Sequence, residues 1–296
     1  MGSVFHDGEL AVQQRMGQGH IAARVGRGIR ADIPGPAAAF LADQPMVVIA
    51  TADDAGRPWV GQIIGLPGFA QVVDARTILL GGRPAAGDPL VTLLRTRRRV
   101  GLIALQPQTR RRVRINGVAE PDGEGIRLTT EQVYSNCPQY ITRRRIVAFE
   151  PALPGPPVRA ASLNSTARQI ISAADSFFVG SADPDGNADA SHRGGNPGFL
   201  RVLSPTQLRW PDYRGNSMFM TLGNIVTDPR CGLLVPDWAT GATLHLTGLA
   251  EITWDEATFA PGAQCSIDFT VTEAVSVPQA SPLRWGEPEL SPVNPA

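Results

Sequence analysis

A short segment in the second half of the chain combines three side chains suited to holding an anion. Ser191, His192 and Arg193 are followed at once by Gly194 and Gly195. On a strand, Ser191 and Arg193 share one face while His192 points to the other. A hydroxyl, a fixed cation and glycines that allow close backbone approach could form a phosphate site. An exposed strand end with a surface arginine and a glycine turn explains the same residues equally well.

Ser191 and His192 also suggest a serine nucleophile with a histidine base. Adjacent residues on a strand point in opposite directions, so His192 is badly placed to take a proton from Ser191. We therefore disfavour nucleophilic catalysis at this segment.

A second candidate anion site follows along the chain. Asn216 and Ser217 stand at the start of a helix predicted over residues 217–226, where side-chain and backbone donors could meet an anion. An ordinary helix cap is by itself the commoner explanation. Two candidate sites on consecutive elements shift the balance toward an anion-binding function.

Arginines gather in the first half. Arg112 and Arg114 share one face of a predicted strand, while Val113 and Ile115 turn to the core. A charge run most often forms a solvated or inter-domain face, so we favour that interpretation. A contribution to an acidic ligand across a domain interface is the alternative. The arginines concerned are Arg95, Arg97, Arg98, Arg99, Arg110, Arg111, Arg112 and Arg114.

A segment broken by a proline follows these arginines and offers Asn136, Gln139, Tyr140 and Arg143. It is either a packed connection between domains or part of a binding site. Cys137 has no evident partner that would stabilise a thiolate, so we do not expect it to be a nucleophile.

The two halves of the chain are copies of one module. Residues 47–80 align without a gap with residues 177–210, and after one inserted residue 99–102 align with 230–233. This period is far longer than the roughly 20–50 residues of solenoid repeats, so it indicates a duplicated domain. The candidate anion triplet of the second copy aligns with uncharged residues 61–63 of the first.

Each copy repeats one order of elements: a short helix, antiparallel strands with an Asp-Gly type turn, a second helix and two closing strands. The predicted helices are residues 36–43 and 88–98 in the first copy, and 164–175 and 217–226 in the second. Strands dominate, so each copy is expected to form a small antiparallel β-barrel with flanking helices.

Repeat limits and composition divide the chain into five parts. The predicted parts are an N-terminal arm (1–32), a first copy with a degenerate, Arg-rich site (33–150), a Pro-rich linker (151–158), a second copy with the main site (159–276) and a Pro-rich C-terminal tail (277–296). The arm should hold an amphipathic helix around residues 9–16. Its GxGxxA pattern at 17–22 follows no strand and opens no convincing helix, so we give it no weight. The tail is expected to wrap the surface or to be disordered.

Composition narrows the function further. The 296 residues include no lysine, and 27 arginines balance 27 acidic side chains. A net charge of zero disfavours nucleic-acid and membrane partners. Any phosphate site must use arginine, hydroxyl or backbone N–H groups, and Schiff-base chemistry on a lysine is excluded. The first 150 residues hold 19 arginines against 13 acidic residues and the rest 8 against 14. Opposite charge could therefore help the halves dock.

The cysteines and histidines indicate neither a disulfide framework nor a metal site, because the three cysteines are scattered and the four histidines lack ligand spacing. No apolar run reaches the roughly 18 residues of a membrane span, and the N-terminus lacks an export signal. We expect a soluble, cytoplasmic protein.

Taken together, these segments resemble the pyridoxamine 5′-phosphate oxidase-like flavin-binding proteins, and more closely their two-copy branch of predicted flavin-nucleotide-binding proteins. The matching pieces cover most of residues 5–254, and their combination is specific although each piece alone is weak. They are Phe5–Glu9, Asp88–Leu90, Thr109–Arg112, Asn136–Ile141, Asp189–Gly195, Leu222–Asn224 and Asp228–Arg230.

The resemblance implies tandem split β-barrels that form an intramolecular pseudo-dimer and bind FMN in the cleft between them. One flavin cleft per chain is expected, with a degenerate second, and a further homodimer is left open. By position, the cofactor-binding residues are Ser191, His192, Arg193, Gly194, Asn216, Ser217, Met218, Leu222 and Asn224, with Gln139, Tyr140 and Arg143 closing the cleft from the other side.

The implied activity is an FMN-dependent oxidoreductase that moves hydride or electrons between the flavin and a small-molecule substrate, with NAD(P)H as a candidate reductant. The alternative is a flavin-, deazaflavin (F420)- or haem-binding protein without turnover. No catalytic side chain is identified. The oxidase itself uses lysine at its phosphate sites and this chain has none, so vitamin B6 oxidation is in doubt.

Overall fold

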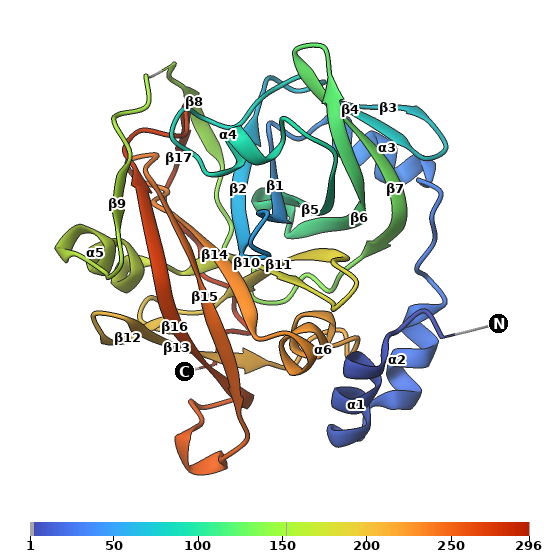
Figure 1. Cartoon of the computed structure of the whole chain (residues 1–296), viewed down its shortest axis with the longest axis vertical. Coiled ribbons are helices and arrows are strands. Elements are labelled where there is room, and N and C mark those ends of the chain that lie inside the picture. The colour runs from blue at the N-terminus through green and yellow to red at the C-terminus, as the bar shows by residue number, and fades with distance from the viewer. Residues whose placement is uncertain (1–2, 152, 296) are drawn as a thin grey trace.

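The first copy of the module forms one antiparallel sheet of seven strands. The computed structural model describes residues 3–151 and 153–295. In the first copy the strand order is β2-β1-β5-β6-β7-β4-β3 (Figure 1). The strands are β1 (Met46–Ala52), β2 (Pro58–Ile64), β3 (Ala70–Asp74), β4 (Thr77–Leu80), β5 (Arg98–Gln106), β6 (Arg111–Asp122) and β7 (Gly125–Ser135).

The second copy repeats this sheet with the order β11-β10-β14-β15-β16-β13-β12, and a short strand β9 adds to β16. Its strands are β10 (Ser176–Ala182), β11 (Ala188–Gly194), β12 (Arg201–Ser204), β13 (Gln207–Tyr213), β14 (Arg230–Pro236), β15 (Thr243–Thr253) and β16 (Ala263–Val277), with β9 at Val158–Ala160.

Strand order and register agree between the copies. Arg99 lies opposite Val118 in the first copy, and the aligned Arg230 lies opposite Leu249 in the second. The predicted mainly β fold and its tandem duplication are therefore confirmed. The two split barrels pack on each other through β1, β2, β5 and β6 of one copy and β10, β11, β14 and β15 of the other, which makes the chain an intramolecular pseudo-dimer.

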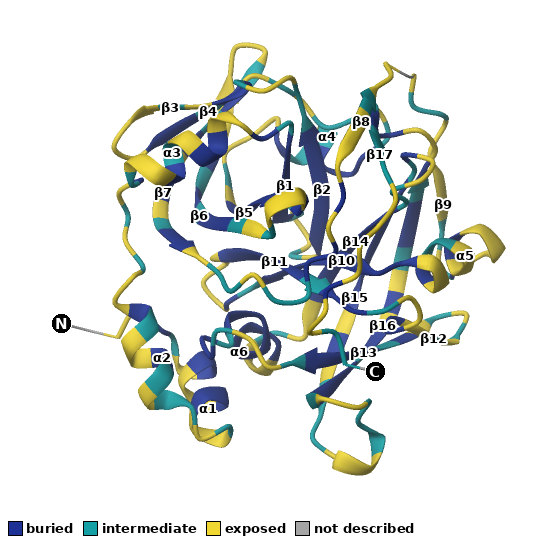
Figure 2. Cartoon of the chain, turned by 180° about the vertical axis from the view of Figure 1, so that it is seen from behind, coloured by how far each residue is buried: buried dark blue, intermediate teal, exposed yellow. Residues whose placement is uncertain are grey.

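The strand β1 is buried on both of its faces. Val47 and Ile49 belong to the core of the first barrel, whereas Val48 and Ala50 pack with Phe178 of the second copy. A strand covered on both sides is apolar throughout, which explains why this stretch of sequence shows no alternation. Figure 2 shows the buried strands running through the junction of the two barrels.

Glycine permits the close approach of the two sheets. A Cβ atom at Gly180 would lie 2.6 Å from a methyl carbon of Val60 and 2.8 Å from the Cβ atom of Ala50. Any larger residue at position 180 would push the barrels apart.

Ion pairs between the copies join arginines of the first half to carboxylates of the second. Arg57 lies 3.0 Å from Glu273, and Arg144 makes two contacts with Asp175, one of them at 3.2 Å. In both pairs the arginine belongs to the positively charged first half and the carboxylate to the negatively charged second half, as the charge distribution of the sequence predicts.

Short helices flank each barrel. Asn164 caps one of them by accepting a hydrogen bond from the N–H of Ala167 at 2.8 Å. The helix expected over residues 88–98 is much shorter, because the chain from Arg98 onward pairs with β6 instead. The helices are α3 (Gly35–Ala42), α4 (Leu90–Leu93), α5 (Ser165–Ala173) and α6 (Met220–Thr227), with 3₁₀ turns η1 (Pro107–Thr109) and η2 (Glu256–Thr258).

The N-terminal arm forms two helices, α1 (Asp7–Arg15) and α2 (Gly19–Gly26), and α1 packs on α6 (Figure 1). His6 and Glu9 form a capping box at the start of α1. Our expectation that the GxGxxA pattern opens no helix was wrong, because α2 begins at Gly19. No strand precedes this helix, so the dinucleotide-binding arrangement is still missing.

The C-terminal tail wraps the surface as far as residue 295. Its strand β17 (Leu283–Trp285) pairs with β8 (Ile146–Phe149), and Trp285 stacks edge-on against Trp238 with ring centroids 5.1 Å apart. Residue 152 of the predicted linker lies outside the described residues. Within the part of the chain that the structure describes, no helix is long and apolar enough to cross a membrane.

Candidate functional site

Several of the predicted anion-binding residues of the second copy line a small cavity at the junction of the barrels, whereas His192 is not among its lining residues. Ser191 and Arg193 face it from β11, Asn216 and Ser217 come from the loop before α6, and Arg114 reaches in from β6 of the first copy. We call this cavity, about 60 Å³ in volume, the anion cradle. Its lining residues are Arg114, Ser191, Arg193, Asp212, Tyr213, Gly215, Asn216, Ser217, Phe219, Met220, Thr221 and Leu222.

Guanidinium groups from both copies meet around the anion cradle. Arg114 forms a buried ion pair with Asp189 at the start of β11. Arg193 lies 3.2 Å from Asp212, a carboxyl whose pKa is raised by burial more than Arg193 lowers it. Arg112 has no acidic partner among the described residues, so the cluster carries an excess of positive charge.

Arg112 contacts a neutral histidine instead. Its Nη1 lies 3.1 Å from Nδ1 of His192, and burial, together with the charges of Arg112 and Arg193, lowers the pKa of His192 well below its usual value. Nδ1 therefore accepts the hydrogen bond, and the imidazole proton sits on Nε2. Burial and the neighbouring Arg114 and Arg193 lower the pKa of Arg112 to about 9, so its guanidinium stays charged at neutral pH.

Each of these three guanidinium groups keeps an unused donor. The Nε atoms of Arg112, Arg114 and Arg193 are buried and have no hydrogen-bond partner among the described residues. Buried donors are rarely left unpaired, and like charges gathered away from water repel each other. An anion bound among these arginines would accept hydrogen bonds from the unpaired Nε donors and would reduce the repulsion between the positive charges.

The loop before α6 holds its backbone in an unusual conformation. Ser217 and Phe219 have φ angles of 65° and 59°, in the left-handed region that costs most residues energy. Ser217 Oγ donates to Gln18 of the arm at 2.6 Å, and Asn216 Oδ1 accepts from the N–H of Met218 at 3.1 Å. The helix starts at Met220, three residues later than predicted.

The segment 136–143 approaches the end of β11 from the first copy. The ring of Tyr140 packs at a tilt against that of Tyr213 with centroids 5.1 Å apart, and the Tyr140 hydroxyl donates to the carbonyl of Arg214 at 3.1 Å. A Cβ atom at Gly194 would collide with the carbonyl oxygen of Tyr140, which explains the glycine. Gln139 is half-buried, whereas Arg143 turns away and pairs with Glu289 of the tail.

Three further predicted residues are buried close by. Met218 packs with Phe5 in a cluster between the arm and the first copy, and Leu222 belongs to the core of the second barrel. Asn224 donates to Ser181 at 3.0 Å and its Oδ1 lies 2.9 Å from His6 Nε2. Asn224 therefore faces a different cavity from the anion cradle.

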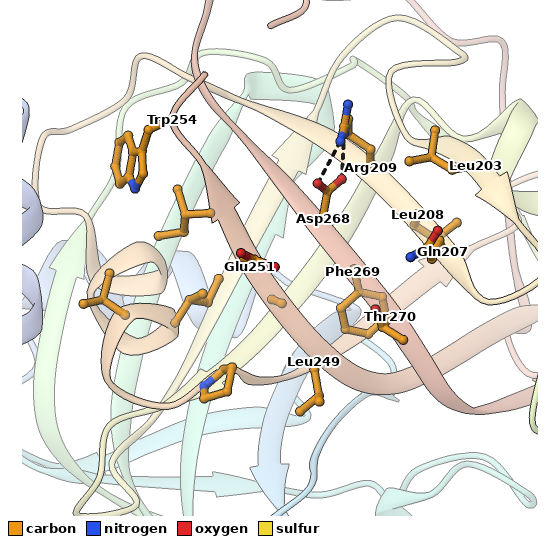
Figure 3. Close-up of a pocket in the computed structure, with 15 residues that line it drawn as sticks. Leu203, Gln207, Leu208, Arg209, Leu249, Glu251, Trp254, Asp268, Phe269 and Thr270 are labelled. Atoms are coloured by element: carbon orange, nitrogen blue, oxygen red, sulfur yellow. Dashed lines mark hydrogen bonds and ion pairs between the residues drawn. The ribbon is translucent and has the colours of Figure 1, made fainter. Parts of the chain in front are cut away.

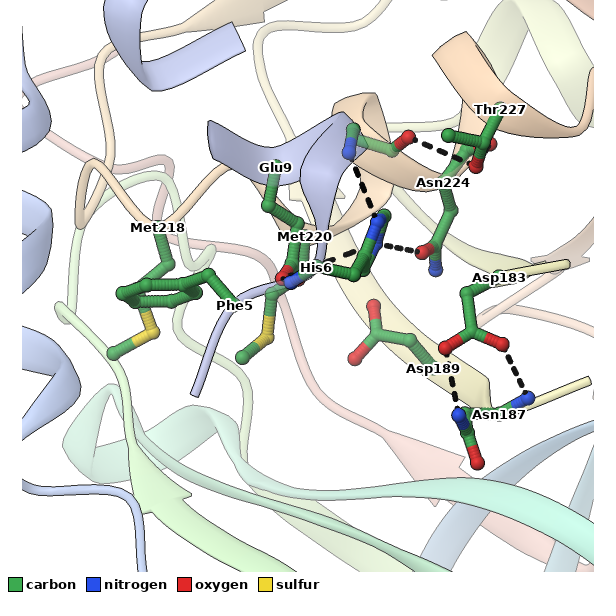
Figure 4. Close-up of polar contacts among 12 residues, drawn as sticks. Phe5, His6, Glu9, Asp183, Asn187, Asp189, Met218, Met220, Asn224 and Thr227 are labelled. Carbon is green, nitrogen blue, oxygen red and sulfur yellow. Dashed lines mark hydrogen bonds and ion pairs between the residues drawn. The ribbon is translucent and has the colours of Figure 1, made fainter. Parts of the chain in front are cut away.

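That second cavity, about 420 Å³ in volume, lies between the arm, β6–β7 and the hairpin turn joining β10 to β11 (Figure 4). We call it the acidic cavity. Asp189 and Met220 place it next to the anion cradle. Its lining residues are Ser3, Val4, Phe5, His6, Glu9, Asn116, Glu131, Gln132, Asp183, Asp185, Asn187, Asp189, Met220 and Asn224.

The equivalent place in the first copy contains a carboxylate where the second copy has an arginine cluster. Asp88 is fully buried, 3.9 Å from His245, whose Nδ1 donates to the carbonyl of Val60 at 2.7 Å. The Asp88 carboxyl fills the space that a side chain at Gly61 would need, at the position aligned with Ser191. An anion would meet a carboxyl group there.

A larger groove of about 730 Å³ opens on the far side of the second barrel (Figure 3). Its lining mixes apolar residues, such as Leu208, Phe269 and Trp254, with polar ones. The ion pair between Arg209 and Asp268 is made by two hydrogen bonds of 2.6 and 2.8 Å. This groove shares no residue with the anion cradle, and its lining contains no arginine besides Arg209.

Sequence reasoning found the arginines of the first copy but missed two other groups at the site. The predicted solvated or inter-domain face of Arg112 and Arg114 is inter-domain, because Arg114 is 5% exposed and pairs with Asp189 of the second copy, and Arg112 contacts His192. Asp189 and Thr221 were not singled out, although Thr221 Oγ1 lies 2.8 Å from Ser191 Oγ. One sequence signal did point to this face. Arg112 and Arg114 of the first copy are replaced by Thr243 and His245 at the aligned positions of the second copy.

Structural comparisons find solved structures that each cover about 40% of this chain. A protein from Clostridium acetobutylicum, related to general stress protein 26 and of the pyridoxinephosphate oxidase family, is 12% identical; the match covers 41% of this chain and 92% of that one, with a TM-score of 0.32. An FAD-binding protein from Mesorhizobium loti is also 12% identical, with coverages of 40% and 97% and a TM-score of 0.28. HupZ of Group A Streptococcus is 12% identical, with coverages of 37% and 89% and a TM-score of 0.30.

No curated protein matches the chain at a significant level. The sequence model of the pyridoxamine 5′-phosphate oxidase family matches twice, over residues 33–152 and 163–281. These two matches span most of the chain and coincide with the two barrels. The chain therefore belongs to the pyridoxamine 5′-phosphate oxidase family, with two copies of the family's domain in one polypeptide.

Proposed function

We propose that the protein binds FMN with its phosphate in the anion cradle and acts as a flavin-dependent oxidoreductase on a small molecule. The observation that carries the proposal is the set of three buried Nε donors without partners, two of them on arginines that line the cradle, Arg114 and Arg193, and the third on the neighbouring Arg112. Bound flavin would supply the hydride or electron transfer, while the protein supplies position and electrostatics.

The anion cradle fits a phosphate ester in size and chemistry. Its volume of about 60 Å³ has room for a small oxyanion such as a phosphate group. Arg114 and Arg193 would bring positive charge, and the hydroxyls of Ser191 and Thr221 can turn to donate. The remainder of the cofactor would extend out of the cradle into the space between the barrels.

His192 and Arg112 would act as a positioning pair. The neutral imidazole holds the guanidinium of Arg112 at the back of the cluster without cancelling its charge. Tyr140, packed on Tyr213, would close the cleft from the side of the first copy. Neither arrangement needs a lysine, which the chain lacks.

One flavin per chain follows from the difference between the copies. In the proposed arrangement the second copy (159–276) holds the phosphate and the first copy (33–150) lends Arg112 and Arg114. The equivalent place in the first copy holds the Asp88 carboxyl beside His245, and this carboxyl already accepts hydrogen bonds from the backbone N–H groups of Gln62 and Leu90 that a phosphate would need.

The first experiment is a visible absorbance spectrum of the purified protein, followed by titration with FMN. We expect a yellow protein, or FMN uptake that saturates and protects the protein against heat. Protein that is colourless and takes up no FMN would refute the proposal. Tight uptake of a deazaflavin or of haem in place of FMN would also refute it.

A second experiment separates an oxidoreductase from a carrier. The FMN-loaded protein is mixed with NADH or NADPH without oxygen, and the flavin absorbance is followed. Bleaching supports turnover. Flavin that stays oxidised with NADH, NADPH and every other reductant tried would refute the proposed activity. The proposed flavin binding would still stand.

A further inference from the structure

The acidic cavity gathers carboxylates from several separate elements. Glu9 comes from the arm, Glu131 from β7, Asp183 and Asp185 from the turn between β10 and β11, and Asp189 from β11. His6 is the only basic side chain in the lining, and its Nε2 lies 2.9 Å from Oδ1 of Asn224. The negative charge of this cavity contrasts with the positive charge of the neighbouring anion cradle.

One buried acceptor in this cavity has no donor, because the Oδ1 atom of Asn116 is buried without a hydrogen-bond partner. Glu9 is 5% exposed; its Oε2 accepts from the N–H of His6 at 2.9 Å, and no hydrogen bond to its Oε1 is found among the described residues. Burying an acceptor without a hydrogen bond is costly, so Asn116 indicates a ligand that donates an N–H bond, and Oε1 of Glu9 is free to meet the same ligand.

Figure 4 shows that the side chains of Glu9, Asp183 and Asp189 point into the same space beside His6. The two oxygens of Asp183 are already engaged by the backbone N–H and the side-chain amide of Asn187, at 2.8 and 2.7 Å. Glu9 is therefore the buried carboxyl that is free to meet a ligand.

The arrangement suits an organic cation better than a metal ion. Among residues 3–151 and 153–295, no group of three or more histidine, cysteine, aspartate or glutamate side chains converges closely enough to hold a metal. The carboxylates are instead spread along the wall of a cavity of about 420 Å³. Such spacing matches a ligand of several atoms with more than one N–H donor.

We infer that the acidic cavity binds a small organic cation, an amine or guanidine, with Glu9 as its buried hydrogen-bond partner. This ligand would be the substrate class of the neighbouring flavin site, and that part of the inference rests on the proposed function. The binding site itself does not depend on the flavin.

Glu9 gives the binding a measurable proton signature. Burial raises the pKa of Glu9 to about 8, with Asp189 and Asp183 adding to the rise while the N–H of His6 and the charge of Arg114 oppose it. The carboxyl is therefore mostly protonated at pH 7 in the free protein. A cation placed beside it favours the carboxylate, so binding should release a proton.

The test is calorimetric titration of the full-length protein with putrescine, a diamine of suitable size, and with the uncharged 1,4-butanediol as its control. Titrations at pH 7 in buffers of different ionisation enthalpy report the protons released. We expect putrescine to bind with release of a fraction of a proton and the diol not to bind. Absence of putrescine binding would overturn the inference.

Variants identify the cavity. Glu9→Gln keeps the capping geometry of α1 and should weaken putrescine binding at least tenfold and abolish proton release. Asp185→Asn, at an exposed turn, should weaken binding about threefold to tenfold, as expected for loss of one solvent-screened charge. Glu124→Gln, fully exposed in the hairpin of the first copy, is the matched control and should change nothing. Equal effects of all three variants would show non-specific charge attraction and overturn the site.

The two proposals fail separately. Protein that takes up FMN but ignores putrescine would refute the cation site and leave the flavin site standing. Protein that binds putrescine through Glu9 but takes up no FMN would keep the cation site, refute the flavin function and remove the substrate role assigned here.

Discussion

Arg114 of the first copy and Asp189 of the second form a buried ion pair that joins the two barrels and separates the anion cradle from the acidic cavity. Both side chains are about 95% buried. Asp189 Oδ1 also accepts from the hydroxyl of Tyr134 at 3.1 Å, and Ser191 donates to its Oδ2 at 3.3 Å. One carboxylate thus organises residues from both copies around the site.

Breaking this pair should destabilise the whole protein. Arg114→Met leaves a buried carboxylate without its cation, which costs about 3–5 kcal/mol of unfolding free energy. Denaturant unfolding measures the change. The surface pair Arg127 and Asp122 offers a control, because both side chains are roughly 40% exposed and Arg127→Met should cost less than about 1 kcal/mol. Similar losses in the two variants would show that the buried pair has no special role.

Glu9 should make stability fall as pH rises. Its pKa is about 8 in the folded protein and 4.5 is the ordinary value, so the folded state holds an extra proton between these limits. Stability is therefore greatest below pH 4.5 as far as Glu9 is concerned, and its contribution is lost as pH rises toward 8, by up to about 1.4 kcal/mol per pH unit.

The check is to measure unfolding free energy from pH 5 to pH 8 for the natural protein and for Glu9→Gln, which cannot titrate. The difference between the two curves should grow with pH in favour of the variant. Parallel curves would mean that Glu9 is ionised in the folded protein.

The close approach at Gly194 predicts a local structural effect. Gly194→Ala places a Cβ atom against the carbonyl of Tyr140 and should displace the segment 136–143, at a cost of about 1–3 kcal/mol. Gly19→Ala is the matched control, since an added Cβ there meets nothing within 4 Å. Thermal unfolding of both variants gives the comparison, and an unchanged midpoint for Gly194→Ala would contradict the contact.

Most of the fold could be predicted from the sequence because the second copy acts as an internal control on the first. The Asp-Gly type turns, the apolar strands and the helix cap at Asn164 are each determined by residues that are close together in the sequence. The helix after Asp88 was predicted too long, since pairing of Arg98 with β6 is a long-range contact that overrides local helix propensity.

The site was only half predictable for the same reason. Ser191 and Arg193 could be found because their types and spacing suggest an anion site within one strand. The role of Arg114 depends on which face of the first barrel meets the second copy, and no local pattern records that. The acidic cavity was missed because its carboxylates come from residues up to 180 positions apart in sequence and meet only when the arm packs on α6.

Flavin stoichiometry tests the asymmetry between the copies. The carboxyl of Asp88, beside His245, replaces the arginine cluster in the first copy, so we expect one FMN per chain at saturation. Flavin released by heat or acid and counted against protein concentration provides the number. Two flavins per chain would mean that the equivalent place in the first copy accepts a phosphate despite Asp88.

The most direct test compares FMN binding by Arg193→Ala and Ile63→Ala, which alter aligned positions in the two copies. Loss of charge-assisted hydrogen bonds from Arg193 should cost about 1.5–3 kcal/mol, or roughly tenfold to a hundredfold in affinity. Ile63→Ala, a core substitution, should lower stability while changing FMN affinity less than about threefold. Quenching of FMN fluorescence on titration gives both dissociation constants under conditions in which each variant is folded. Equal weakening by the two substitutions, or none from Arg193→Ala, would contradict the assignment of the flavin phosphate to the second copy.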